Sequence, residues 1–366
     1  MSIKREPITR LEVSGYKSIK NCRIDFERVN VFIGSNGAGK SNIISVFQFL
    51  QNILGKNLQK TIDTNKINSL FYNGKEKDSE IMFEVYFGNL SYGLYLKPTE
   101  NNKVIIKKEY FTDQNRERNK IIISEESSES SWDIGTGENI DKEIIPILAK
   151  QNWRLYHFGD MGCNASIKQK QDISNNKFLT ENGENLAAFL YNLKQNYKEY
   201  YIEIIETIKL VAPYFQDFIL VPDEENQKQI ALRWKQIGFR DIFDASEFSD
   251  GLLRFICITA LLLQPYELLP TTIIIDEPEL GLHPFAITIL SEMIRQLPED
   301  NQIIISTQSS DVLNEFDVEE VIVIHRDQGK TVCKRLNYQE LEIWLDNDYT
   351  LAELWKKNIL GGRLSK

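Results

Sequence analysis

The sequence predicts an α/β fold, and three features of the chain support this. An apolar run at residues 29–33 is followed by a glycine-rich stretch and then by apolar residues at helical spacing, so strand, loop and helix follow in that order. Short alternating runs at residues 80–123 predict an antiparallel β lobe. Apolar runs at residues 272–275 and 302–305 predict two more buried strands, which complete the α/β part.

The chain is expected to divide into three parts. Residues 1–150 hold the glycine-rich stretch and the β lobe. Residues 151–228 are expected to form a helical lobe, because apolar residues recur at i, i+3, i+4 and i+7 within residues 186–193. Residues 229–366 return to strand-like and then strongly apolar sequence. The serine and glutamate cluster at residues 124–131 is expected to be an exposed loop.

Composition limits the class of protein. The chain has 366 residues and is 42% hydrophobic, enough for one large core or two smaller ones. Its apolar runs are interrupted well short of the ~20 residues that a membrane helix requires, and residues 1–10 do not resemble a signal peptide. We therefore expect a cytoplasmic protein with no membrane partner. The net charge of −10 disfavours bulk electrostatic coating of nucleic acid, although a local basic groove stays open.

The cysteines do not form a recognisable framework. Cys22, Cys163, Cys257 and Cys333 lie far apart in the sequence with no paired spacing, which argues against a zinc ribbon or a set of disulfides. Buried or idle thiols are expected.

The glycine-rich stretch matches the pattern G-x-x-x-x-G-K-[ST] over residues 34–41. Glycines let backbone amides turn toward phosphate oxygens, and the following helix N-terminus adds positive potential. Lys40 would reach the β and γ phosphates, and the Ser41 hydroxyl would bind Mg²⁺. A chance glycine turn is the alternative, which the flanking strand and helix disfavour. The residues expected to hold the nucleotide here are Gly34, Asn36, Gly37, Ala38, Gly39, Lys40, Ser41 and Asn42.

A second motif consists of two acidic residues, which follow the apolar run that ends at residue 275. Asp276 would bind Mg²⁺ through its water shell, and Glu277 would orient or deprotonate the attacking water. The alternative is a strand that ends in an acidic turn before Pro278.

Ser249 and Gly251 precede an apolar helix and lie shortly before Asp276. A helix N-terminus with a hydroxyl and a glycine in front of it can grip a γ-phosphate with oriented dipoles. Considered alone, this segment is an ordinary helix cap made by Ser249.

Along the chain, a phosphate loop, a β lobe, a helical lobe, the Ser249–Gly251 segment and the strand that ends in Asp276 and Glu277 follow one another. This order resembles that of the ABC-type ATPase heads of the RecF, SMC and OLD-like branch, and the resemblance covers nearly the whole chain. The segment at residues 276–284 has the form of that branch. The chain is most similar to small stand-alone predicted AAA-family ATPases of bacteria, many of which look like components of anti-phage defence operons. The resemblance implies a P-loop NTPase fold: an ABC ATPase head with an antiparallel β lobe and a helical lobe.

The resemblance also implies how the site works. ATP and Mg²⁺ would lie between the phosphate loop of one subunit and Ser249 and Gly251 of another, in a homodimer or higher homo-oligomer that closes on ATP binding and opens on hydrolysis. Lys40 and Glu277 would be catalytic. Gln308 stands where the family carries a switch histidine; it can donate a hydrogen bond but cannot carry charge, so slow hydrolysis is one consequence.

Other residues are open to more than one interpretation. Gln151 is the nearest candidate for the family's metal-linking glutamine. A structural hydrogen-bonding role is favoured for His157 and Asp160. His283 is equally consistent with a dimer-facing loop and with a helix entry, and for His325 a structural role is favoured.

Three functions remain open. The first is an ATPase switch that licenses a separately encoded effector such as a nuclease, since the residues after 308 are expected to form a last strand, a connection and a short helix. The second is a DNA-repair-type ATPase whose dimer clamps a duplex. The third is a scaffold that binds ATP for assembly with little turnover. A small GTPase or kinase is disfavoured by the long gap between Ser41 and Asp276.

Overall fold

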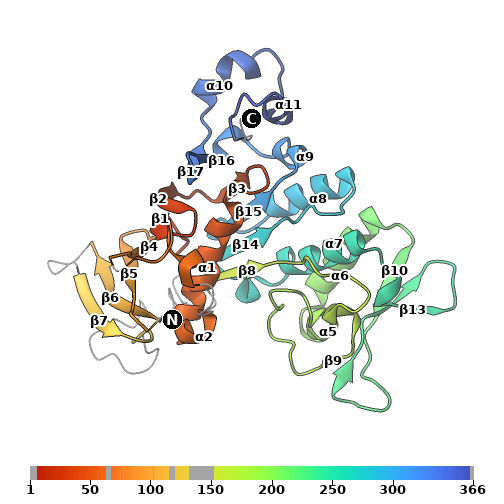
Figure 1. The fold of residues 1–366 in the computed structure, drawn as a ribbon. Helices are drawn as coiled ribbons and strands as arrows, with labels where there is room; N and C mark the ends of the chain where they lie inside the picture. The colour runs from red at the N-terminus through yellow and green to blue at the C-terminus, as the bar shows by residue number, and fades with distance from the viewer. Residues whose placement is uncertain are drawn as a thin grey trace. The chain divides into compact units, whose positions relative to one another are not determined.

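The computed structural model describes residues 6–62, 67–76, 78–101, 103–114, 120–131 and 152–362. Helices and strands are mixed, which confirms the α/β prediction (Figure 1). The chain forms two compact units, one of residues 1–155 with 300–366 and one of residues 156–299. This division groups the helical lobe with the segment that carries Ser249 and Asp276, whereas the sequence-based division separates them at residue 228. Within the described ranges, no helix is long and apolar enough to cross a membrane.

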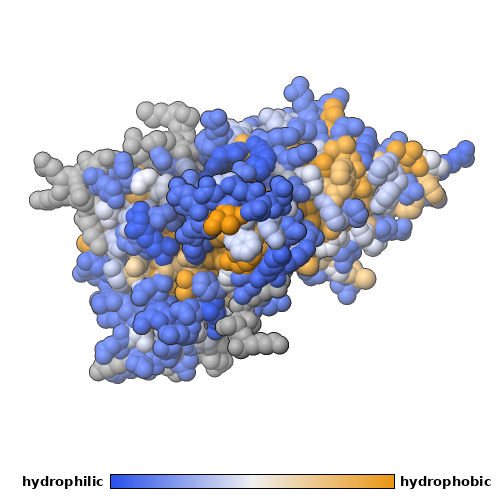
Figure 2. Space-filling view, turned by 90° about the horizontal axis from the view of Figure 1, so that it is seen from above, coloured by the Kyte–Doolittle hydropathy of each residue, from blue (hydrophilic) through white to orange (hydrophobic). Residues whose placement is uncertain are grey.

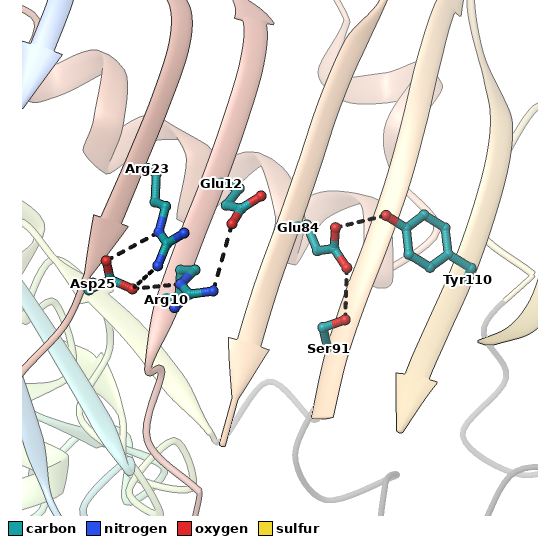
Figure 3. Close-up of polar contacts among 7 residues, drawn as sticks. All are labelled: Arg10, Glu12, Arg23, Asp25, Glu84, Ser91 and Tyr110. Carbon is teal, nitrogen blue, oxygen red and sulfur yellow. Dashed lines mark hydrogen bonds and ion pairs between the residues drawn. The ribbon is translucent and has the colours of Figure 1, made fainter. Parts of the chain in front are cut away.

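The β lobe of the first unit is a six-stranded antiparallel sheet in the order β2-β1-β4-β5-β6-β7. Its strands are β1 (Arg10–Tyr16), β2 (Ile19–Asp25), β4 (Ile81–Phe87), β5 (Leu90–Pro98), β6 (Val104–Asp113) and β7 (Lys120–Ser127). Strand β4 alternates between buried and half-buried residues. Figure 3 shows polar contacts across the strands, including the 2.5 Å ion pair of Arg10 with Asp25. The predicted β lobe is therefore present.

The serine cluster at residues 124–131 is only in part the exposed loop that we expected, because residues up to Ser127 belong to strand β7 and Ser130 is buried. The reason is Glu109, whose side chain is fully buried in the sheet. Its carboxylate accepts hydrogen bonds from the hydroxyls of Tyr92 (2.7 Å), Ser124 (2.9 Å) and Ser130 (2.6 Å). A buried carboxylate needs such donors, and the serines supply them.

The first unit also contains a parallel core built on strand β3 (Val29–Ile33), all of whose residues are buried. Strands β15 (Gln302–Thr307) and β16 (Val321–Asp327) pair with β3 in parallel, and β17 (Lys330–Arg335) pairs with β16 in antiparallel fashion. The helices of this unit are α1 (Lys40–Leu54), α2 (Leu58–Thr61), α3 (Ile67–Leu70), α9 (Ser310–Leu313), α10 (Tyr338–Leu345) and α11 (Leu351–Lys356). The parallel strands end at one edge, where their connecting loops meet.

The second unit holds the predicted helical lobe. Its helices are α5 (Leu186–Asn196), α6 (Lys198–Val211), α7 (Asp250–Leu262) and α8 (Pro284–Arg295), and its strands are β9 (Gln171–Asp172), β10 (Phe215–Ile219), β11 (Gln229–Ile230), β12 (Arg233–Gln236), β13 (Ile242–Asp244) and β14 (Thr272–Asp276). Strand β8 (Trp153–Tyr156) lies where the chain passes from the first unit to the second. The ring of Trp234, on β12 of the β10-β12-β13 sheet, stacks on that of Phe248, with the ring centroids 4.5 Å apart.

Apolar side chains are also exposed on the second unit. Ile237, Phe239 and Ile242 lie at the β12–β13 turn and are each about half exposed. Figure 2 shows hydrophobic surface over this unit, on an otherwise mostly hydrophilic face.

Candidate nucleotide site

The glycine-rich loop connects β3 to α1 and has the backbone that its glycines predict. Gly37 and Gly39 adopt φ angles of 78° and 110°, which side-chain-bearing residues rarely reach. A Cβ atom at Gly39 would lie 2.2 Å from Oγ1 of Thr331, so the backbone approach at this point also requires glycine. Gly39 caps α1 without any side-chain hydrogen bond. The cradle therefore fits an anion such as a triphosphate.

Lys40 is held inside this loop. Its side chain is buried, with 5% of the residue exposed, and its Nζ atom donates to the carbonyl oxygens of Gly34 (2.5 Å) and Ser35 (3.4 Å). These carbonyls keep the ammonium group over the loop, where phosphate charge would need neutralising. Ser41 is exposed at the start of α1, so its hydroxyl fits the expected role as a magnesium ligand.

Polar contacts that the sequence did not predict hold the phosphate loop and the start of α1 in place. Asn42, expected among the nucleotide-binding residues, donates from Nδ2 to Oγ of Ser18 at 2.6 Å. Ser18 and Thr331 share a hydroxyl hydrogen bond at 2.7 Å. Ser35 donates to the carbonyl of Gly362 at 3.2 Å, so the C-terminal segment also contacts the loop. No sequence signal marks these contacts, because the partners are separated by as many as 327 residues.

Gln308 lies at the same edge of the parallel core as the phosphate loop. Thr307, the last residue of β15, pairs with Ile33, the last residue of β3. Because the two strands are parallel, Gln308 and Gly34 leave the sheet together. Gln308 is exposed, and the turn that follows it is fixed by the backbone amide of Ser309, which donates to Oγ1 of Thr307 at 3.0 Å.

The second unit holds the acidic pair. Asp276 ends β14, and Glu277 follows with a φ angle of 49°, in the left-handed region. Non-glycine residues occupy this region at a cost, often where a side chain must be aimed for function. Nδ1 of His157 lies 3.6 Å from Oδ2 of Asp276. The sequence analysis favoured a structural role for His157, and the structure places it beside the predicted magnesium ligand.

Ser249 and Gly251 lie at the N-terminus of α7. Oγ of Ser249 accepts from the backbone amide of Leu252 at 3.2 Å, so Ser249 is the helix cap that its position predicts. Gly251 packs against the loop that follows Glu277, since a Cβ atom there would lie 2.1 Å from the carbonyl oxygen of Gly281. The start of α7 and this loop are therefore in backbone contact.

Arg254 is a residue of this site that the sequence analysis missed. It is buried in α7, with 5% of the residue exposed, and burial lowers the pKa of its guanidinium. Nε donates to the carbonyl of Phe158 at 2.8 Å, Nη2 to that of Gly159 at 3.4 Å, and Nη1 to that of Leu280. The arginine thus joins α7 to the loops that carry His157 and follow Glu277. The signal that could have revealed it is a charged residue in the interior of a helix that is otherwise apolar after its first turn.

The structure therefore assembles the predicted residues in two groups. The phosphate loop and Gln308 belong to the first unit, and Ser249, Gly251, Asp276 and Glu277 belong to the second. Oxygen donors such as the Ser41 hydroxyl and the Asp276 carboxylate suit Mg²⁺. Gln151, the third predicted metal ligand, lies outside the described residues.

Two of the remaining polar candidates, Asp160 and His283, have local structural contacts. Oδ1 of Asp160 accepts from the backbone amide of Gly162 at 3.2 Å, in agreement with the structural role favoured for it. His283 caps α8, where its Nδ1 atom accepts from the amide of Phe285 at 3.3 Å. His325 is half-buried in β16.

Comparisons with known proteins agree with this geometry. The chromosome partition protein Smc of Methanocaldococcus jannaschii is 33% identical over 86 residues, which is 22% of this chain and only 7% of that protein. An SmcHead bound to the C-winged helix domain of ScpA matches with a TM-score of 0.61 and 15% identity, over 92% of this chain and 99% of that one. A Smc head domain with an extended coiled coil, bound to the C-terminal domain of ScpA and derived from Pyrococcus furiosus, matches with a TM-score of 0.55 and 14% identity, over 93% and 99%.

These structural likenesses show that the fold is that of a P-loop NTPase with an ABC-type ATPase head, as the motifs predicted. A family model described as "AAA domain, putative AbiEii toxin, Type IV TA system" matches residues 29–314, from the phosphate-loop strand to the segment after Gln308. The chain belongs to this family of AAA-domain proteins.

Proposed function

We propose that this chain binds and hydrolyses ATP with Mg²⁺ and acts as a nucleotide-driven dimer switch. The observation that carries the proposal is the loop between β3 and α1. Its left-handed glycines, its enclosed Lys40 and a helix N-terminus that has no side-chain cap suit a triphosphate. Membership of a family of AAA domains supports the same function.

Each residue of the site has its own role in the proposed hydrolysis of ATP. Lys40 and the backbone amides of the loop stabilise the charge on the β and γ phosphates, and Ser41 and Asp276 hold the metal. Magnesium, when bound, neutralises charge on the transferred phosphoryl group. Glu277 orients the attacking water and accepts its proton. Gln308 donates a hydrogen bond from its amide but carries no charge, so we expect slow turnover.

A second copy of the chain would complete the site. Ser249 and Gly251, at the N-terminus of α7, would grip the γ-phosphate bound by the other copy. Leu280 and Phe285, on and after the loop that follows Glu277, are about half exposed, which fits a surface that a second copy covers. ATP binding would favour the closed homodimer, and hydrolysis would release it.

The biological role that we propose is a cytoplasmic sensing or regulating subunit of an anti-phage defence system, with a separately encoded effector such as a nuclease. The family description, which names a toxin of a Type IV toxin–antitoxin system, supports a role in a multi-component system of this kind. Co-purification of the chain with its genomic neighbours, with and without ATP, tests for the effector. Absence of any ATP-dependent partner would contradict this part of the proposal.

The central test is the solution mass of Glu277→Gln, measured by light scattering with and without ATP and Mg²⁺. This variant should bind ATP but turn it over slowly, so its mass should double when ATP is added. Lys40→Ala in the same background should stay at the nucleotide-free mass, because the phosphates lose their cation. A Glu277→Gln variant whose mass does not respond to ATP would contradict the dimer switch.

Two other functions have some support. The second candidate is a DNA-binding ATPase of the repair type, and the similarity over 86 residues to a chromosome partition protein supports its DNA-binding part. It predicts duplex binding that tightens with ATP and weakens with salt. Gln308, in place of a charged switch residue, favours an ATP-bound scaffold. A scaffold would keep its function in Glu277→Gln and lose it in Lys40→Ala.

A further inference from the structure

Cys22 and Cys333 form a thiol pair that the sequence analysis did not foresee. Their Sγ atoms lie 3.0 Å apart, although the residues are separated by 311 positions. Cys22 lies on β2 and Cys333 on β17, both within the first unit. The two strands belong to different sheets, one in the β lobe and one in the parallel core. These two thiols are therefore paired in space, although their spacing in the sequence gave no sign of a pair.

The surroundings hold the two strands in place for a covalent bond. The backbone amide of Thr331 donates to the carbonyl of Ser18 at 2.9 Å, and the hydroxyls of the same residues are 2.7 Å apart. This contact lies two residues before Cys333 and four before Cys22. A disulfide has an S–S distance of about 2.05 Å, so the sulfur atoms need to approach by only ~1 Å. Thr331 is also the residue that packs against Gly39 of the phosphate loop.

The two thiols suit stepwise oxidation, in which one sulfur is oxidised and the other then displaces the added oxygen. Both residues are half-buried, so a small oxidant can reach them. The neighbouring thiol of Cys22, together with burial, holds the pKa of Cys333 well above its usual range. Because the two sulfur atoms lie 3.0 Å apart, a thiol oxidised at either position has the other within reach to resolve it.

We propose that Cys22 and Cys333 are a reversible oxidation site, at which a peroxide converts the thiol pair into a disulfide that joins β2 to β17 beside the phosphate loop. One thiolate of the pair attacks one peroxide oxygen, the O–O bond breaks, and a sulfenic acid forms with release of water. The second thiol then attacks the sulfur of the first, the S–O bond breaks, and a second water leaves. The two thiols together lose two electrons and two protons, and the peroxide is reduced to two waters.

The experiment uses the full chain carrying Cys163→Ser, because Cys163 is exposed and would otherwise form disulfides between molecules. The protein is treated with hydrogen peroxide and analysed by intact mass and by peptide mapping without reductant. We expect the mass to fall by two hydrogen atoms, a cross-linked peptide that contains Cys22 and Cys333, and reversal by dithiothreitol. The midpoint of thermal unfolding should rise by several °C in the oxidised form, because the bond closes a very long loop.

Two further variants separate this site from non-specific oxidation. In the same background, Cys333→Ser should gain oxygen atoms at Cys22 and form no cross-link, and Cys22→Ser should form none either. Their thermal midpoints under reducing conditions show whether they fold. The proposal is overturned if the parent accumulates oxygen on either cysteine without a cross-link, or if neither cysteine reacts.

Discussion

Nδ1 of His157 lies 3.6 Å from Oδ2 of Asp276, the carboxylate expected to hold Mg²⁺. The backbone amide of His157 donates to the carbonyl of Glu181 at 2.9 Å, which fixes the start of its loop. Groups that contact a metal ligand orient it, and their loss commonly weakens metal affinity by about 10–100-fold. We therefore predict that His157→Ala raises the Mg²⁺ concentration for half-maximal ATP turnover by about 10-fold or more.

This prediction can be separated from a general loss of the fold. Binding of a fluorescent ATP analogue in EDTA should be unchanged in His157→Ala, because that measurement does not involve the metal. Asp160→Asn is a matched control, since Asp160 lies on the same loop and contacts only a local turn in the structure. An unchanged Mg²⁺ requirement in His157→Ala would show that the imidazole has no part in the site.

Arg254 is predicted to be a large contributor to the stability of the second unit. Its guanidinium donates to three carbonyls on two loops, and lysine cannot reproduce that planar set of donors. Arg254→Lys should lower the free energy of unfolding by about 2–3 kcal/mol, the cost of leaving buried carbonyls without donors. Unfolding in urea measures this difference in the free energy of unfolding. Arg295→Lys, at the exposed end of α8, should change stability by less than about 0.5 kcal/mol, and equal effects at both positions would contradict the prediction.

The parts of the fold that could be predicted are those specified by local sequence. The strand, glycine loop and helix around Lys40 follow from a motif and from the spacing of apolar residues, and the structure has them where they were expected. The β lobe and the paired helices α5 and α6 follow from alternation and from helical stripes in the same way. Such patterns report which face of an element is buried, so they need no knowledge of the partner.

The contacts that could not be predicted join residues far apart in the chain. Arg254 and the carbonyl of Phe158 are 96 residues apart, and Ser18 and Thr331 are 313 apart. Their partners are carbonyls and hydroxyls, which every sequence contains in abundance. The exposed loop predicted at residues 124–131 was wrong in part, because the composition of this segment is typical of a loop. Its contact with the buried carboxylate of Glu109 is not visible in the local sequence.

The buried carboxylate leads to a test in the β lobe. Ser130→Ala removes one of the hydroxyl donors to Glu109, whose side chain is fully buried. We predict a loss of about 1–3 kcal/mol in the free energy of unfolding, the range for a buried polar group that loses a hydrogen-bond partner. Ser128→Ala, on the exposed side of the same segment, is the control and should have little effect. If Ser130→Ala unfolds at the same urea concentration as the parent, the carboxylate does not depend on this donor.

The contact between Gly251 and Gly281 connects the proposed γ-phosphate grip to the loop that follows Glu277. A methyl group at position 251 would lie 2.1 Å from the backbone oxygen of Gly281, so the loop must move in Gly251→Ala. Overpacking of this kind destabilises the folded conformation by about 1–3 kcal/mol. If the closed dimer needs this loop in its present position, the same cost weakens ATP-dependent dimerisation by about 5- to 150-fold.

Light scattering of Gly251→Ala in the Glu277→Gln background measures this effect, with protein concentration varied in the presence of ATP and Mg²⁺. Gly162→Ala is the matched control, because a methyl group there meets only an ordinary contact with Asp160 at 3.5 Å. The control should dimerise like the parent. If Gly251→Ala dimerises at the same concentration as the parent, the start of α7 moves independently of the loop that follows Glu277. The contact between Gly251 and Gly281 would then not link γ-phosphate binding to Glu277.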